Sequence, residues 1–190
     1  MPYRLVLHPR DPDYAPENIS ELIEVLRQMG FIGDAWGEPQ AQRFLIGDRF
    51  LQLVTFMGCA PAIELAPATG MGAAQSDEFC HVGISPIHPA IQFIADGENV
   101  MPRCPHCRRR YAAWQEQLAS WQTDQAHQAR CPACRKHFSP TALDWRQAAG
   151  FGRIFISVFN VYPREALPTD ALLGRLGEAT SSKWLYFYVR

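Results

Sequence analysis

Apolar positions near the N-terminus follow two different spacings, which predict a strand and then a helix. Residues 3–7 form a short apolar run typical of a strand. After a proline-rich turn, Asn18 is a suitable N-cap, and Glu21 three residues later fits a capping box. Gly30 can adopt the left-handed conformation that ends a helix. The apolar residues between these signals recur at helical spacing: Ile19, Leu22, Ile23, Leu26 and Met29.

The next part of the chain predicts a hairpin and a long loop. Residues 43–46 and 49–57 are largely apolar and lie on either side of Gly47-Asp48. A two-residue connection of this kind between apolar runs predicts a β-hairpin. Residues 58–76 are rich in Ala, Pro and Gly, which indicates a long loop.

The remaining apolar runs predict three more strands and a second helix. Residues 153–161 are apolar on both faces, as expected of a central strand. Thr169 is a suitable N-cap for a helix that carries leucines at positions 172, 173 and 176. Residues 91–95 form a short element of undetermined type. The predicted strands are residues 79–84, 153–161 and 183–189.

The two ends of the chain resemble each other, which bears on the fold. Each end has a strand, then Pro-Arg, then a second proline, then a capped helix. The resemblance is either a weak βα repeat or the general way in which a strand turns into a helix, and we favour the second interpretation. Under either interpretation the elements predict an α+β fold with a mainly antiparallel sheet and helices on one face.

The composition is that of a globular protein, with 47% hydrophobic and 19% charged residues. The first ten residues lack the apolar run of a signal peptide, and no stretch approaches the roughly 18 apolar residues of a membrane helix. We therefore expect a cytoplasmic protein with no membrane partner. Thiols stay reduced in the cytoplasm, so paired cysteines there favour a metal site over disulfides.

Four of the six cysteines lie in two Cys-Pro-x-Cys motifs that are 23 residues apart. Two such turns supply the four thiolates of a tetrahedral zinc site. Four unligated thiols and a redox Cys-x-x-Cys pair are the alternatives, and we disfavour both. A full cysteine set closes the coordination shell, so the zinc has a structural role and neither His106 nor His137 is needed as a ligand. The sequence thus predicts one zinc ion bound by Cys104, Cys107, Cys131 and Cys134.

The paired motifs resemble those of zinc-ribbon domains over residues 101–146. The resemblance implies a ribbon fold and a metal, but no activity. The segment between the motifs exceeds the roughly 15–20 residues usual for this pattern, and it predicts a helix that packs against the rest of the protein. We predict a helix-containing zinc ribbon inserted into a body of residues 1–100 and 147–190. The apolar stripe of the inserted helix consists of Tyr111, Trp114, Leu118 and Trp121.

Basic charge is concentrated around the cysteines. Residues 101–153 carry a net charge of +6 and the rest of the chain −7. The basic residues either form a nucleic-acid-binding surface or offset the thiolates and attract the acidic body, and we favour the second interpretation. If residues 108–110 lie on a helix, their side chains spread over about 200°, which does not suit one phosphate surface. The residues concerned are Arg103, Arg108, Arg109, Arg110, Arg130, Arg135 and Lys136.

A further set of polar residues lies in or near the predicted loop. Their thiol, imidazole and carboxylate groups could form a Cys–His nucleophile or a second metal site, but their spacing matches no known motif. Adjacent residues of a strand point to opposite faces, which separates the thiol at position 80 from the imidazole at 81. The glycines at 70 and 72 lack the lysine of a phosphate-binding loop. The candidates are Cys59, Glu64, Cys80, His81 and His88.

Trp184, Tyr186 and Tyr188 share one face of the last predicted strand. Such a stripe either stacks on single-stranded bases or packs in the core, and we favour packing. Taken with the cysteines, these features favour a zinc-binding, non-catalytic protein that recognises another protein or acts as an adaptor. A nucleic-acid-binding protein that uses the arginines is the second hypothesis. An enzyme with its active site under residues 58–89 is the third.

Overall fold

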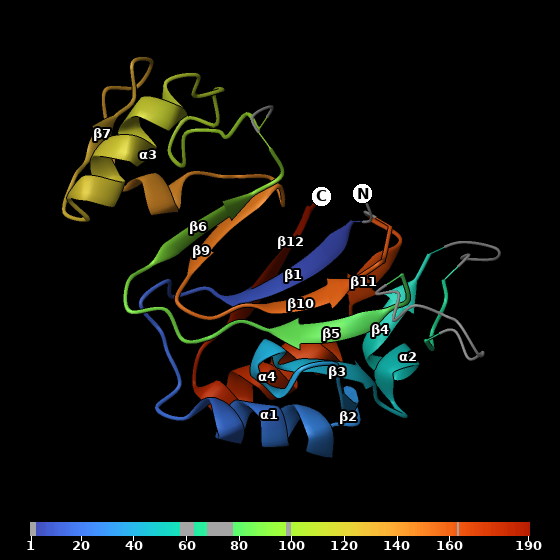
Figure 1. Ribbon diagram of the computed structural model, residues 1–190. Helices are drawn as coiled ribbons and strands as arrows, with labels where there is room; N and C mark the ends of the chain where they lie inside the picture. The colour runs from blue at the N-terminus through green and yellow to red at the C-terminus, as the bar shows by residue number, and fades with distance from the viewer. Residues whose placement is uncertain (1–2, 58–62, 68–77, 98–99, 163) are drawn as a thin grey trace.

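A six-stranded sheet forms the centre of the molecule (Figure 1). The computed structural model describes residues 3–57, 63–67, 78–97, 100–162 and 164–190. All neighbouring strands of the sheet pair antiparallel, in the order β12-β1-β10-β5-β3-β2. Their bounds are β1 Arg4–Pro9, β2 Ile32–Trp36, β3 Arg43–Ile46, β5 His81–Ile84, β10 Ile156–Phe159 and β12 Trp184–Val189.

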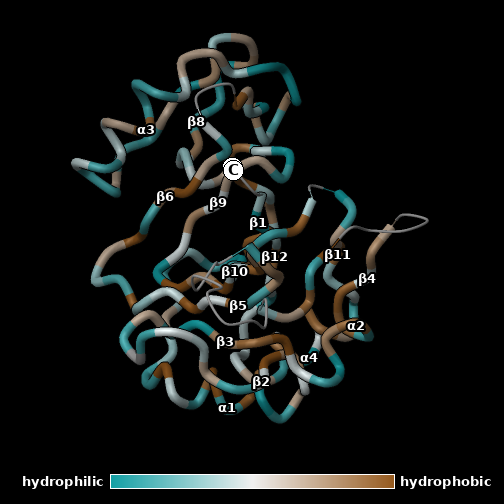
Figure 2. Tube along the Cα trace, turned by 45° about the vertical axis from the view of Figure 1, so that its right-hand side comes forward, coloured by the Kyte–Doolittle hydropathy of each residue, from teal (hydrophilic) through white to brown (hydrophobic). Residues whose placement is uncertain are grey.

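Two helices, α1 (Ile19–Gln28) and α4 (Asp170–Thr180), cover one face of this sheet (Figure 1). Their buried leucines share a core cluster with Leu5 and Leu7 of β1. Both predicted N-caps are present, because the Asn18 side chain accepts a hydrogen bond from the amide of Ser20 and Thr169 from that of Leu172. The predicted α+β class with a mainly antiparallel sheet is confirmed. Hydrophilic and hydrophobic residues are interspersed along α1, and the buried Leu22 and Leu26 are four positions apart, as in an amphipathic helix (Figure 2).

Four of the strands and the two helices follow the order β1-α1-β5-β10-α4-β12 and lie in the sheet as β12-β1-β10-β5. This is a split β-α-β-β-α-β arrangement, which β3 and β2 extend beyond β5. The similar chain ends are its two βα halves, each a central strand followed by a helix on the same face. The repeat interpretation that the sequence disfavoured therefore describes the architecture better.

The predicted hairpin at Gly47-Asp48 is wrong. The chain beyond it forms the short helix α2 (Phe50–Leu53) and then β4 (Val54–Phe56), which pairs with β11 (Ala166–Pro168) in a separate sheet. The partners of β3 are instead β5 and β2, and the sequence did not predict β2. Position 47 is glycine for a different reason, because a Cβ there would lie 2.3 Å from the carbonyl oxygen of Gly30.

A two-stranded antiparallel sheet of β6 (Gln92–Ala95) and β9 (Ala149–Gly152) covers the other face. It packs over β1 and β12, where Val6, Phe187 and the partly buried Ile94 share a small cluster. Gly150 makes this crossing possible, since a Cβ there would meet the Phe187 ring at 2.4 Å and His8 Nε2 at 2.8 Å. Sequence periodicity missed β9 because two of its four residues are glycines.

The segment between β6 and β9 forms a smaller module, with α3 (Trp114–Thr123), β7 (Ala129–Arg130) and β8 (His137–Phe138). It lies beyond β6 and β9, away from α1 and α4 (Figure 1). The predicted stripe on α3 packs inward, as expected. Trp121 meets Phe151 edge-on at 5.3 Å between ring centroids, and Trp114 meets Trp145 in the same way at 5.3 Å. The buried cluster around α3 thus reaches β9.

The last strand also packs as predicted. Trp184 and Tyr188 are buried, and the hydroxyl of Tyr188 donates a hydrogen bond to the carbonyl of Ala166 at 2.7 Å. The indole N–H of Trp184 donates to Thr180 at 2.8 Å. These two rings are therefore part of the core and not a platform for bases. In the part of the chain that is described, no helix is long and apolar enough to cross a membrane.

The close crossing at Gly150 leads to a stability prediction. The Phe187 ring that a Cβ would meet is fully buried and cannot move aside cheaply. We expect Gly150→Ala to lower the free energy of unfolding by about 1–3 kcal/mol, as overpacking does. Urea unfolding of the purified variant measures the change.

Gly174→Ala is the matched control, because this glycine lies within α4 and a Cβ there meets nothing within 4 Å. It should leave stability unchanged or raise it by up to about 1 kcal/mol, since alanine favours a helix. Equal effects of the two substitutions would contradict the proposed crowding.

Candidate functional site

The four cysteines of the two motifs come together in space. Their sulfur atoms all lie within 4.8 Å of one another, so the cluster could hold a metal ion. The sulfurs of Cys104 and Cys134 are 3.8 Å apart, and those of Cys107 and Cys131 are 3.7 Å apart. A tetrahedral zinc ion with Zn–S bonds of about 2.3 Å requires sulfur–sulfur edges of roughly 3.8 Å. The cluster is therefore compatible with a zinc site.

The two motifs form matching turns. In the first, the amide of Arg108 donates to the Cys104 carbonyl at 3.0 Å, and Arg108 has a positive φ of 62°. In the second, the amide of Arg135 donates to the Cys131 carbonyl at 2.9 Å, with φ 61°. The repeated left-handed residue reverses the chain directly after each second cysteine. Each turn thereby directs both of its sulfurs to the same point.

The electrostatics of the cluster favour a bound cation. Burial opposes ionisation of the Cys131 thiol, but hydrogen bonds from the amides of Cys134 and Ala133 and from two neighbouring thiols lower its pKa to about 6. The amide of Lys136 favours ionisation of Cys134, yet burial and the three other cysteines raise the pKa of Cys134 to about 11. Like charges at this distance oppose one another. A divalent cation removes that repulsion and allows all four thiols to ionise.

Neither predicted spare histidine joins the cluster, which consists of cysteines alone. His106 and His137 are exposed, and His106 Nε2 lies 3.3 Å from the carbonyl oxygen of His137. This contact links the two turns across their outer side. The cysteine cluster is complete without either histidine, as the sequence predicted.

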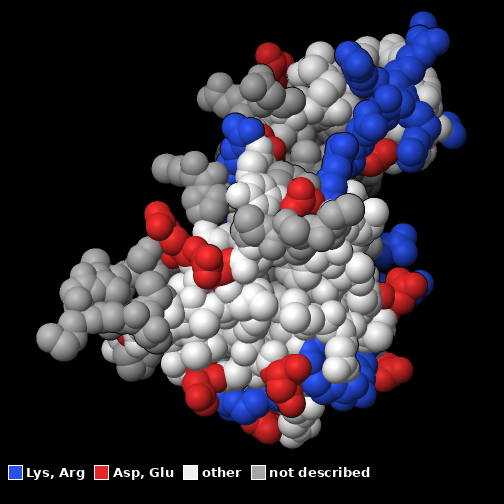
Figure 3. Space-filling model, turned by 90° about the vertical axis from the view of Figure 1, so that its right-hand side faces the viewer, with Lys and Arg blue, Asp and Glu red and all other residues white. Residues whose placement is uncertain are grey.

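The basic residues of the module face solvent more than the favoured interpretation assumed. Six of the seven are exposed, and Arg103 is half-buried. Within the fold, Arg108 pairs with Asp144 at 3.1 Å, and Arg130 Nε donates to the Arg135 carbonyl at 3.3 Å. The helical spread assumed for residues 108–110 is wrong, because α3 begins only at Trp114. Figure 3 shows Lys and Arg side chains gathered on the module.

The residues near the predicted loop do not assemble into a catalytic group in the described structure. Cys80 is fully buried in the main core, and burial raises the pKa of its thiol to about 12. His81 is also buried; its Nδ1 donates to the Phe79 carbonyl at 2.9 Å, and its ring stacks on Phe159. The Glu64 side chain is exposed, and the backbone of His88 bonds Arg153. Cys59, Gly70 and Gly72 lie outside the described residues.

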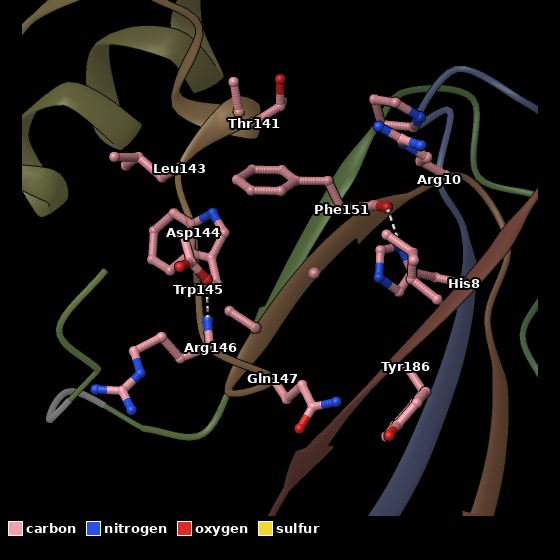
Figure 4. Close-up of a pocket in the computed structure, with 15 residues that line it drawn as sticks. His8, Arg10, Thr141, Leu143, Asp144, Trp145, Arg146, Gln147, Phe151 and Tyr186 are labelled. Carbon is pink, nitrogen blue, oxygen red and sulfur yellow. Dashed lines mark hydrogen bonds between the residues drawn. The ribbon is translucent and has the colours of Figure 1, made fainter. Parts of the chain in front are cut away.

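A cleft of about 580 Å³ lies where the module meets the main sheet, and sequence reasoning missed it. We call residues 141–147, which return from the second turn to β9, the arm. The arm forms one wall, His8 and Arg10 at the end of β1 another, and β9 and β12 complete the cleft (Figure 4). Its parts are far apart in sequence; the bonded residues His8 and Phe151, for example, are 143 positions apart. Only the fold brings them together.

His8 is the buried titratable group of this cleft. Its Nδ1 donates a hydrogen bond to the Phe151 carbonyl at 2.9 Å, which holds β1 against β9. Burial lowers the pKa of His8 to about 4, although this hydrogen bond acts in the opposite direction. The imidazole is therefore neutral at pH 7, with its proton on Nδ1.

No protein-family model, curated protein or solved structure matches this chain. The function is therefore inferred from the geometry of the cysteine cluster, the basic surface and the cleft.

The lowered pKa of His8 predicts a pH-dependent stability. Above pH 6.5 the imidazole is neutral in both the folded and the unfolded chain. Below this pH the unfolded chain takes up a proton that the folded chain refuses until about pH 4. Between about pH 7 and pH 4.5 this linkage should remove about 2.5 kcal/mol of stability. Urea unfolding of the wild type and of His8→Gln at both pH values isolates it.

Other groups also titrate over this range, including any cysteine that releases a metal, but they are common to both proteins. The difference in pH dependence between wild type and His8→Gln thus reports on His8 alone. Identical losses of stability in the two proteins would contradict a neutral, buried His8.

Proposed function

We propose that the chain is a zinc-binding protein in which one zinc ion on Cys104, Cys107, Cys131 and Cys134 maintains the module as a recognition element for a partner protein. The observation that supports this proposal is the sulfur cluster, whose two measured edges of 3.7 and 3.8 Å suit a tetrahedral zinc ion. The repeated left-handed turns at Arg108 and Arg135 are a local geometry suited to that purpose.

The proposed zinc is structural. Four thiolates complete a tetrahedron and leave no position for water or substrate, so the ion has no open site for chemistry. Its contribution is to the fold: it joins the segment before α3 to the segment after it. We further propose that residues 101–146 behave as a zinc-dependent ribbon, with Phe93 and Phe151 as the surfaces against which it packs. Metal binding then supplies much of the free energy that orders this segment.

The proposed partner is a protein with an acidic surface. The module presents exposed arginines, a residue type enriched at protein interfaces, together with the exposed side chain of Met101. A nucleic acid is the second candidate, and the solvent exposure of Arg109, Arg110 and Arg135 is the observation that favours it. The two candidates differ in how binding depends on salt.

The metal assignment makes a direct prediction. Elemental analysis of the purified protein should find one zinc per chain. Cys104→Ser removes one thiolate from the shell, so zinc should be lost and residues 101–146 should lose protection in hydrogen exchange. The amides of α1 should remain protected, because α1 packs in the separate main core.

Cys80→Ala is the control, because it removes a buried thiol that is remote from the cluster in the fold. This variant should keep one zinc per chain. A folded module without metal would contradict the zinc proposal. Equal loss of protection in α1 and in α3 after Cys104→Ser would contradict the separate zinc-dependent unit.

The choice between partners is tested with oligonucleotides. Under the proposed function, single- and double-stranded 20-mers should bind no more tightly than about 10⁻⁴ M at physiological salt, the weak end of non-specific binding. Fluorescence anisotropy at two salt concentrations measures this. Binding that is much tighter, and that Arg109→Gln with Arg110→Gln weakens and makes less salt-dependent, would replace the protein partner by a nucleic acid. Arg27→Gln with Arg175→Gln removes the same charge from the body and controls for net charge.

A further inference from the structure

We infer that the cleft between the arm, β9 and the ends of β1 and β12 is a binding site for a small organic anion with a flat apolar body. This site goes beyond the proposed function, because neither the zinc ion nor a partner protein requires it. Its size of about 580 Å³ falls within the range of small-molecule sites. The ligand class follows from the charge and shape of the lining.

The apolar part of the ligand corresponds to the apolar walls. Leu143 of the arm and Phe151 of β9 line the cleft but are mostly buried in the cluster around α3, whereas Leu185 of β12 lines it and is partly open to solvent. Leu185 is 45% exposed although it is a large hydrophobic residue, so part of this wall is open to solvent. A planar hydrocarbon group in the cleft would cover the exposed part of Leu185.

The anionic part corresponds to the charge of the cleft. Arg10 and Arg146 line it and are exposed. Asp144 also lines it, but its carboxylate is already engaged: Oδ1 accepts the amide of Arg146 at 3.1 Å and Oδ2 pairs with Arg108 at 3.1 Å. His8 is neutral and adds no charge. Figure 4 shows the Arg146 guanidinium directed away from Phe151 and His8 and the Arg10 guanidinium on the His8 side, so the uncompensated positive charge of the cleft comes from Arg10.

A buried donor in the wall lacks a partner. The indole Nε1 of Trp145 is buried without a hydrogen bond, and Trp145 itself is 6% exposed. An unsatisfied buried donor costs about 1–3 kcal/mol. Figure 4 shows this nitrogen turned toward Phe151, another lining residue. An acceptor atom of a ligand that enters the cleft next to Phe151 would offset the cost.

The rim of the cleft holds a strained turn. Arg146 and Gln147 have positive φ values of 53° and 60°, and the amide of Ala148 closes the turn onto the Trp145 carbonyl at 3.0 Å. Glycine and asparagine are the residues that suit such a turn. Here two long polar side chains occupy it instead, at the mouth of a cationic cleft. The Tyr188 amide holds the turn by donating to the Gln147 carbonyl at 3.0 Å.

The cysteine cluster supports one wall of the cleft. The backbones of Arg103 and Asp144 exchange two hydrogen bonds of 2.9 Å, and Arg103 precedes the first cysteine of the cluster. The Arg108–Asp144 ion pair adds a second link from the same turn to the arm. Loss of the proposed zinc should therefore loosen the arm and weaken ligand binding, a consequence that rests on the proposed function.

The test uses the whole 190-residue chain and three probes: 3-phenylpropionate, phenyl phosphate and the neutral 3-phenylpropan-1-ol. Titrations followed by two-dimensional ¹H–¹⁵N NMR should show one or both anions binding with a Kd of about 1 mM or tighter and shifting the indole resonance of Trp145. The neutral alcohol should bind at least about tenfold more weakly, since it lacks the charge that Arg10 attracts. Binding of the carboxylate alone or of the phosphate alone identifies the head group.

Arg10→Gln should weaken binding of the anion about tenfold, and Ala142→Trp, which fills the cleft from the exposed face of the arm, should abolish it. Arg175→Gln removes an exposed arginine outside this cleft and should change nothing. The inference is overturned if neither anion binds, if the alcohol binds equally well, or if Arg10→Gln has no effect. Each of these results leaves the zinc assignment intact, because zinc content is measured separately.

Discussion

The convergence of four cysteine sulfurs within 4.8 Å of one another is the constraint around which the module is arranged. Thiolates at this separation repel, so the cluster is stable in its ionised form only around a cation. Hydrogen bonds and an ion pair connect the cysteine cluster to the arm. The first turn carries Arg103 and Arg108, both of which bond Asp144, and Asp144 in turn shapes the arm. A local electrostatic requirement thus shapes a surface that the cysteines themselves do not touch.

The module is attached to the main sheet by packing as well as by the chain. Trp121 and Trp145 contact Phe151, while Gly150 on the same strand lies against Phe187 of the sheet. Strand β9 therefore packs in the module core through Ala149 and Phe151 and against the main sheet through Gly150. The His8–Phe151 hydrogen bond supplies a polar contact at the same crossing. The cleft lies at this junction, where the arm, β9 and the ends of β1 and β12 line it.

The parts of the structure that the sequence predicted are those determined by local spacing. The two Cys-Pro-x-Cys motifs, the caps at Asn18 and Thr169 and the stripe on α3 all depend on residues within a few positions of each other. The hairpin prediction at Gly47 failed because this position is glycine to allow close contact with the backbone of Gly30. Local sequence spacing does not reveal that contact. The cleft was unpredictable for the same reason, since His8, Trp145 and Leu185 have no common motif. The three arginines at 108–110 were treated as helical, but α3 begins only at Trp114, later than the apolar stripe from Tyr111 implied.

The position of residues 85–155 between two neighbouring strands has a topological consequence. The chain leaves the main sheet after Ile84 and returns at Ile156, and these two residues are direct partners in the β5–β10 pair. In topological terms everything between them is one enlarged hairpin loop. The entropy of closing a loop grows only with the logarithm of its length, so this long excursion costs just about 2–3 kcal/mol more than a tight turn. The strand order of the split β-α-β-β-α-β scaffold therefore does not depend on what the loop between β5 and β10 contains.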